Sequence, residues 1–183
     1  HTPDLTGLPI RQGVISMEEI IRGFWNGELD MAIIPNSDNL PNTVEWKPLL
    51  SLRIFAVISN ELPFIHNQAV SLSDLADVPF ICNTVGINHD MTVSFCQYGG
   101  FTPHIIYESS NSLSIGRWLE EGRGVSFISS FDRMTLEESS YETNKVHVLP
   151  IENPELSIEI GIARQIDKIY DSEKRKFLSY SET

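Results

Sequence analysis

A polar loop between a short apolar run and a predicted helix is the clearest candidate for binding chemistry in this sequence. The loop spans residues 83–88 (NTVGIN) and supplies two side-chain amides, a hydroxyl group, a glycine and the unpaired backbone N–H groups of a helix start. Ligands of open α/β sheets bind where strands end and helices begin, and such N–H groups attract anions. We therefore predict a site for a carboxylate or another anion, with ordinary helix capping as the alternative. The candidate ligand-binding residues are Asn83, Thr84, Gly86 and Asn88.

Two more strand ends carry polar side chains that could reach a bound ligand. Asn36 and Ser37 follow the apolar run 29–34, and Ser129 closes the apolar run 125–129. Both places also have an ordinary explanation, because the first could be a simple turn and the second could cap a following helix. The predicted ligand-binding residues therefore come from three strand ends.

The sequence gives little support for a catalytic site or a metal site. The histidines are scattered without HExxH or CxxC spacing, so we expect no metal site and no cofactor. His89, beside the predicted site, has a surface or capping role in this interpretation. GxSxG, Walker and GxGxxG motifs are absent, so we expect no enzyme, while a triad of distant residues stays open. Of the two acids in the turn after residue 27, we predict that Glu28 is solvated and that Asp30 forms local hydrogen bonds.

The charge of the chain argues against direct binding of nucleic acid. Its 13 basic and 25 acidic residues give a formal net charge of −12, whereas proteins grip phosphate backbones with lysine and arginine. The dense basic cluster at 174–176 is predicted to decorate a terminal helix. No run approaches the roughly 18 apolar residues of a membrane span, so no membrane partner is expected.

The two cysteines, Cys82 and Cys96, lie in apolar patterns and are predicted to be buried thiols. Their spacing leaves a disulfide open. The chain opens without the basic and apolar segments of a signal peptide. Together these features predict a reducing, cytoplasmic compartment.

Residues 16–34 predict a complete helix, turn and strand. Ser16 and Glu19 can form a capping box, and Gly27 can supply a left-handed stop. The run 29–34 has the look of a buried parallel strand. The apolar stripe of the helix is formed by Met17, Ile20, Ile21 and Phe24.

The rest of the chain alternates predicted strands and helices, which indicates an α/β fold. Predicted strands cover 5–13, 44–50 with 52–58 as one long or two short strands, 80–83, 104–108, 125–129, 146–151 and 156–163. Predicted helices begin at a Ser71/Asp74 capping box, at Asn88 with Met91, Phe95 and Tyr98 on one face, at Asn111 or a neighbouring serine, at Phe131 and at Ser172. Trp25 and Trp118 are predicted to pack inside.

Four segments in this order resemble the effector-binding domain of LysR-type bacterial transcription regulators. They are 27–34 (GELDMAII), 70–75 (VSLSDL), 100–103 (GFTP) and 121–129 (EGRGVSFIS). The resemblance implies two Rossmann-like α/β subdomains joined by two crossover strands, as in type II periplasmic binding proteins. Subdomain I would comprise 1–58 and 150–183, without the family's first strand and helix, and subdomain II would comprise 59–149.

The resemblance also implies a function. A small polar metabolite, such as an anion, would bind in the cleft between the subdomains and control transcription. DNA would be bound only by a separate N-terminal winged helix-turn-helix, and the intact protein would be a homodimer or homotetramer. The alternative of another class is a solute-binding protein of a transporter with the same fold.

Overall fold

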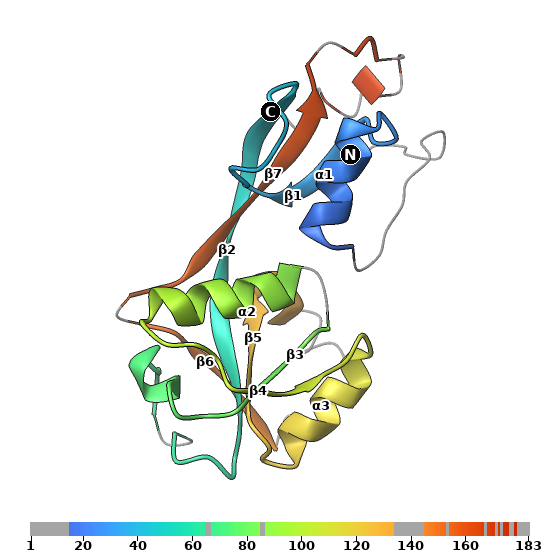
Figure 1. The fold of residues 1–183 in the computed structure, drawn as a ribbon. Coiled ribbons are helices and arrows are strands. Elements are labelled where there is room, and N and C mark those ends of the chain that lie inside the picture. Colours follow the sequence, from blue (N-terminus) through green and yellow to red (C-terminus); the bar gives the residue numbers. More distant parts are fainter. Residues whose placement is uncertain are drawn as a thin grey trace. The chain divides into compact units, whose positions relative to one another are not determined.

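The computed structural model describes residues 15–64, 67–84, 87–133, 145–152, 154–166, 168–170, 172, 174–175 and 178. These residues form two compact units (Figure 1). Unit 1 contains the described residues of 1–50 and 159–183, and unit 2 contains those of 51–158. The sequence placed the boundaries at 58/59 and 149/150. Packing places 51–58 and 150–158 in unit 2, because Ile54, Ile58 and Ile151 belong to its buried core.

The described elements confirm the α/β class. In chain order they are α1 (Met17–Trp25), β1 (Met31–Pro35), β2 (Val44–Ser59), the 3₁₀ helix η1 (Ser73–Leu75), β3 (Phe80–Cys82), α2 (Ile87–Tyr98), β4 (Ile105–Glu108), α3 (Ser112–Glu120), β5 (Val125–Ser129), β6 (Val146–Pro150) and β7 (Ser157–Gln165). In unit 1, β1 pairs with β7, which neighbours β2. In unit 2, β6 and β5 flank β2, and β3 and β4 follow β5. Strands 44–50 and 52–58 are thus one strand.

The helix and turn predicted from residue 16 are confirmed. The Glu19 N–H donates to Ser16 Oγ and the Ser16 N–H donates to Glu19 Oε2, both at 3.2 Å, which is a complete capping box. Gly27 has φ +71°, the left-handed stop. Ile20 and Phe24 are buried against the sheet of unit 1.

The strand that follows this helix differs from the prediction. β1 begins at Met31 and pairs antiparallel with β7, with Ile33 opposite Ile162. Only Ile34 is buried, and Ile33 is 57% exposed. The prediction of a buried parallel strand was therefore wrong, because an apolar run contains no information about the direction of a partner strand far away in the sequence.

Helices cover both faces of the sheet in unit 2. Successive strand residues point to opposite faces, and Phe80 packs in the cluster that contains Met91 of α2, while Ile81 packs with Leu119 of α3. The two helices therefore lie on opposite faces, as in a Rossmann-like unit (Figure 1). The parallel pairs β3–β4 and β3–β5 hold the buried centre of this sheet.

The predicted start of α3 is confirmed, whereas the predictions for η1 and α2 differ from the structure. α3 starts at Asn111, whose Oδ1 accepts from the Leu113 N–H at 2.9 Å. Ser71 and Asp74 exchange backbone bonds of 2.8 and 3.3 Å, but the helix there is the single 3₁₀ turn η1. α2 already begins at Ile87, so Asn88 lies inside its first turn and is not the N-cap.

Three further predictions about side chains have mixed outcomes. Tyr98 is 70% exposed and Trp25 is 69% exposed, so neither packs in a core. Trp118 is partly buried and stacks on Tyr107, with ring centroids 4.2 Å apart. Cys82 and Cys96 are buried and free, so the disulfide alternative is not realised. Burial raises the pKa of their thiols to about 11 and about 12.

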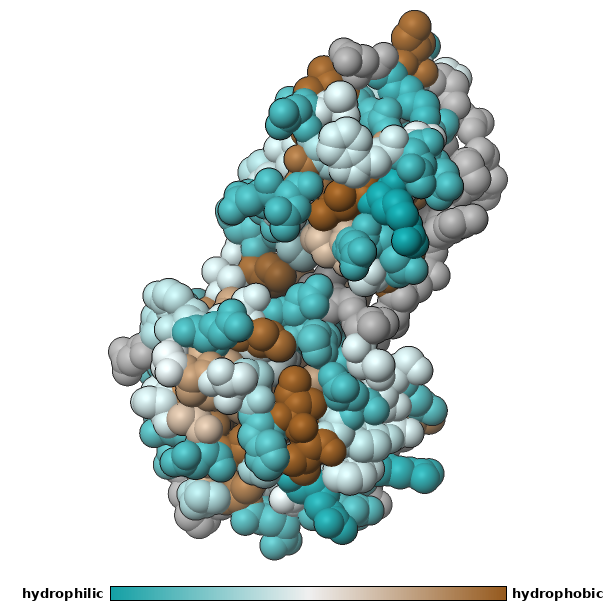
Figure 2. Space-filling model, viewed as in Figure 1, coloured by the Kyte–Doolittle hydropathy of each residue, from teal (hydrophilic) through white to brown (hydrophobic). Residues whose placement is uncertain are grey.

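Some predictions lie outside the described residues. They are the strand 5–13, Gly86, His66, the helix 131–139 beyond residue 133, and most of the helix 172–180. Hydrophilic residues cover much of the face shown in Figure 2, and hydrophobic residues form small separate patches between them. None of the helices in the described ranges is long and apolar enough to cross a membrane.

Candidate functional site

Three of the predicted ligand-binding residues lie at the same edge of the unit 2 sheet. β3 and β5 are parallel, with Phe80 opposite Val125, so both strands end at this edge. Asn83 and Thr84 follow the end of β3, and Ser129 is the last residue of β5. The carboxyl edge of a parallel sheet is where ligands of open α/β folds bind. The structure therefore brings residues from separate segments to an edge suited to binding.

The loop after β3 keeps polar groups available. Asn83 is half-buried and Thr84 is exposed, and within the described ranges neither side chain has a hydrogen-bond partner. Asn88 is half-buried in the first turn of α2, where its carbonyl oxygen accepts from Thr92 Oγ1 at 2.8 Å. The side chains of Asn83 and Thr84 can thus donate to a ligand without breaking a described contact.

Ser129 has a structural use of its own. Its hydroxyl donates to Asp132 Oδ2 at 2.8 Å, and its backbone N–H donates to the same oxygen at 3.1 Å. The Asp132 N–H returns a bond to Ser129 Oγ at 3.2 Å. This reciprocal pattern caps the helical residues 130–133. Helix capping was the alternative role predicted from the sequence for Ser129. A ligand contact by Ser129 stays a prediction.

Asn36 and Ser37 belong to unit 1, directly after β1. Asn36 is exposed. Ser37 Oγ accepts from the Asn39 N–H at 3.3 Å, and the Ser37 carbonyl accepts from the Leu40 N–H at 3.3 Å. The ordinary turn is therefore present, and a ligand contact by these two residues also stays a prediction.

His89 links two elements beside the loop. Its Nδ1 lies 3.2 Å from Asp90 Oδ1, and its Nε2 lies 3.3 Å from Glu108 Oε1 at the end of β4. The ring therefore tethers the first turn of α2 to β4, which agrees with the predicted surface role. Within the described parts of the chain, no three His, Cys, Asp or Glu side chains are placed to hold a metal ion.

Two arginines near the end of β5 were not predicted from the sequence. Ile54 of β2 is opposite Ser129, so Arg53 lies one residue beyond the end of β5. Arg133 belongs to the helical residues 130–133 that follow it. Both guanidinium groups lie over the ring of Phe55, at 5.6 Å for Arg53 and 4.9 Å for Arg133, measured from Cζ to the ring centroid.

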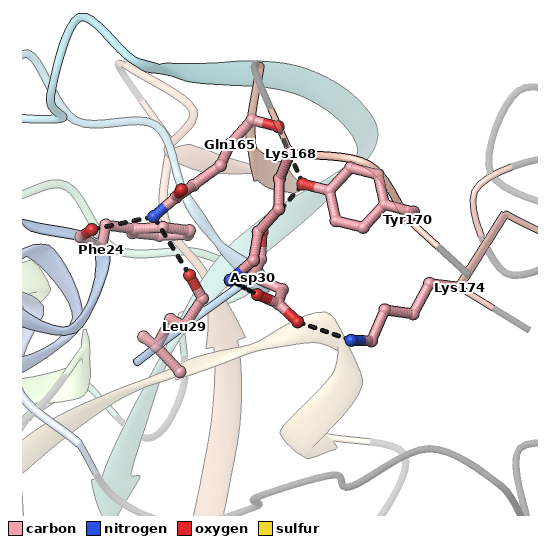
Figure 3. A network of polar contacts seen from close by, with 7 residues as sticks. All are labelled: Phe24, Leu29, Asp30, Gln165, Lys168, Tyr170 and Lys174. Atoms are coloured by element: carbon pink, nitrogen blue, oxygen red, sulfur yellow. Dashed lines mark hydrogen bonds and ion pairs between the residues drawn. The ribbon is translucent and has the colours of Figure 1, made fainter. Parts of the chain in front are cut away.

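Unit 1 contains a polar network centred on Asp30 (Figure 3). The Asp30 carboxylate pairs with Lys168 and, at 2.7 Å, with Lys174 Nζ. Tyr170 Oη donates to the Asp30 carbonyl at 3.1 Å and to the Gln165 carbonyl at 2.8 Å. The expectation of local hydrogen bonds for Asp30 was wrong, because its partners are up to 144 residues away.

The contacts of this network indicate a structural role. Gln165 Nε2 donates to the Phe24 carbonyl at 2.9 Å, which joins the end of α1 to β7. The two lysines that bond to Asp30 hold the pKa of its carboxyl below the usual 3.8. A carboxylate that stays charged and doubly paired is a poor proton carrier at neutral pH. Asp30 therefore holds the chain beyond β7 against the turn that follows α1.

We expect Asp30→Asn to lower the free energy of unfolding of unit 1 by about 1–3 kcal/mol at neutral pH, because both lysines lose a charged acceptor. The folded pKa of Asp30 is depressed, so its stabilisation is complete above 3.8 and is lost as the pH falls through the folded pKa. Urea unfolding between about pH 7 and about pH 3 measures this. Asp38→Asn, at an exposed residue of the same unit, is the control. An equal loss in both variants would contradict the prediction.

Known proteins resemble this chain along most of its length. A family model described as the LysR substrate binding domain matches residues 10–180. The transcriptional dual regulator GltC of Bacillus subtilis (strain 168) is 24% identical over 156 residues, which cover 85% of this chain and 50% of GltC. The chain spans about half the length of the curated relatives it matches.

Solved structures agree with this match. HinK, a LysR family transcriptional regulator from Pseudomonas aeruginosa, has a TM-score of 0.74 and 26% identity, covering 94% of this chain and 58% of HinK. The CcmR regulatory domain of Synechocystis PCC6803, solved in complex with 2-PG, has a TM-score of 0.75 and 17% identity, covering 97% of this chain and 85% of that domain. The type II periplasmic-binding-protein-like fold predicted from the sequence is confirmed.

Proposed function

This chain belongs to the family of LysR substrate binding domains, and from this premise we propose that it senses a small polar effector, with an anion as the favoured class. The observation that carries the proposal is the edge of the unit 2 sheet, where Asn83 and Thr84 offer donors without described partners beside the start of α2. Amide, hydroxyl and helix N–H donors together suit a carboxylate or phosphate.

Two of the predicted ligand-binding residues belong to unit 1. Asn36 and Ser37 follow β1 as Asn83 and Thr84 follow β3. We propose that Asn36, Ser37 and Gly86 also contribute to binding of the effector. Binding would favour one arrangement of the subdomains over another.

The proposal extends to the rest of the protein. The effector would control a winged helix-turn-helix outside this chain, in a homodimer or homotetramer working in the cytoplasm. We assign no enzymatic reaction to the chain. GltC and two further curated relatives are named as transcriptional regulators, which favours a regulator over the solute-binding protein of a transporter.

A panel of small carboxylates and phosphates tests this function. We expect at least one compound to raise the melting temperature, because a ligand at 100 times its Kd adds about 2.7 kcal/mol of stability. The double variant Asn83→Ala, Thr84→Ala should bind that compound about tenfold or more weakly, since a hydrogen bond to a charged group contributes about 1.5–3 kcal/mol.

Thr102→Ala is the matched control, because Thr102 is exposed in a loop of the same unit and lies outside the proposed site. It should bind like the wild type. The sensor function would be refuted if no compound of the panel changed the melting temperature of the wild-type chain.

A further inference from the structure

We propose that Arg53 and Arg133, gathered over the ring of Phe55, form a two-cation subsite that binds the anionic group of a ligand, a carboxylate or a phosphate. The inference rests on the proposed function only in taking that ligand to be the effector. The subsite itself is a property of unit 2, because all three residues belong to that unit.

The two arginines come from separate segments that meet at the ligand-binding edge. The pairing of Ile54 with Ser129 sets Arg53 level with the start of the helical residues 130–133, to which Arg133 belongs. Phe55 is 7% exposed and pairs with Ile128, so its ring is a fixed platform for both cations. Both guanidinium groups are therefore held over the Phe55 ring beside the end of β5.

Arg53 is equipped to accept a ligand. Its Nε is buried and has no acceptor among the described residues. Its one described ion pair is with Glu155, at 3.3 Å, and the Glu155 side chain is 60% exposed. An exposed pair of this kind is weak, of the order of 0–1 kcal/mol. A buried donor without an acceptor is costly, so a ligand oxygen at Nε would satisfy an unmet need.

The charges point to an anion. The Phe55 ring brings two guanidinium groups to one place in a chain whose formal net charge is −12. The planar fork of arginine matches the paired oxygens of carboxylate and phosphate groups. Arginine on an aromatic face keeps its edge donors available, because the cation–π contact uses the flat face. An anionic group at these forks would accept charge-assisted hydrogen bonds.

Arg123 provides an internal comparison. Its Cζ lies 5.8 Å from the Trp118 ring centroid, which is the same kind of contact in the same unit. Its Nε pairs with Glu121 at 3.4 Å, and no second cation lies over that ring among the described residues. Arg123 therefore has the surface contact without the clustered charge or the buried unpartnered donor.

The test is titration of the 183-residue chain with inorganic phosphate and with malonate at constant ionic strength, followed by amide chemical shifts. We expect saturable binding of at least one probe. Arg53→Gln and Arg133→Gln should each weaken it about tenfold or more, the effect of losing one charged hydrogen bond. Arg53→Lys keeps the positive charge but lacks the planar guanidinium group, so this variant should also bind the probe weakly. Glu155→Gln should bind more tightly, because a competing carboxylate is gone.

Arg123→Gln is the matched control and should bind as the wild type does. The subsite would be overturned if neither probe bound saturably, or if the Arg53 and Arg133 variants bound a probe as tightly as the wild type does. The same variants separate it from the sensor function. An effector that binds the wild type and the arginine variants equally would refute the subsite and leave the sensor function standing. If phosphate bound through the arginines but no compound of the effector panel bound the chain, the sensor function would be refuted and the subsite would stand.

Discussion

Replacing Phe127 by alanine is expected to lower the free energy of unfolding of unit 2 by about 3–5 kcal/mol. Phe127 is 2% exposed in the middle of β5. Its ring meets Phe80 edge-on at 5.3 Å and Phe95 at 6.3 Å between centroids, so it joins β5 to β3 and α2. Truncation removes buried apolar area and leaves a cavity that rigid strands on both sides cannot close.

The effect should reach the proposed ligand-binding edge at the end of β5. Phe127 lies two residues before Ser129, so loss of its packing loosens the end of β5. Urea unfolding combined with hydrogen exchange of the β2 and β5 amides measures both consequences. Phe131→Ala is the control, because Phe131 is 63% exposed, and it should change stability by about 0.5 kcal/mol or less. Comparable losses in the two variants would contradict the assignment of Phe127 to the core.

Contacts between near neighbours in sequence were predictable from residue types. The Ser16–Glu19 box, the Asn111 cap and the left-handed Gly27 all form as expected. Each depends on residues within about one helical turn, where geometry leaves few alternatives. The buried strands β3 and β5 were also predictable, because short apolar runs between turn signals indicate central strands.

Contacts across the fold were not predictable from local patterns. Asp30 was expected to bond locally, yet Lys174 is its partner across 144 residues. Arg53 and Arg133 contact the same ring because of the register in which β2 pairs with β5. The local sequence of neither strand determines this register. The direction of β1 depends on β7 in the same way. The loop after β3 could be predicted because polar residues at a strand end are visible in the local sequence. Arg53 and Arg133 could not be predicted together, because the pairing of β2 with β5 brings them to one ring.

Replacing Gly161 by valine is expected to destabilise unit 1 by more than about 3 kcal/mol, at the upper end of overpacking effects. A Cβ atom at Gly161 would overlap the Lys47 carbonyl oxygen and lie 2.5–2.6 Å from the Trp46 ring carbons Cε2 and Cζ2. The carbonyl belongs to the backbone of β2 and has little freedom to move. The Trp46 ring is fixed as well, because its Nε1–H donates to the Ile34 carbonyl at 3.2 Å.

Relief of this overlap would therefore require β7 to separate from β2, or the Trp46 bond to break, and Ile34 is itself the residue paired with Gly161. Gly161→Ala should show the same defect, because its Cβ alone makes the overlap. Gly27→Asn is the control: no atom lies within 4 Å of a Cβ there, and asparagine tolerates its φ of +71°. Urea unfolding that resolves unit 1 from unit 2 gives the measurement. If both Gly161 variants were as stable as Gly27→Asn, this result would contradict the prediction that β2 and β7 leave no room for a Cβ atom at Gly161.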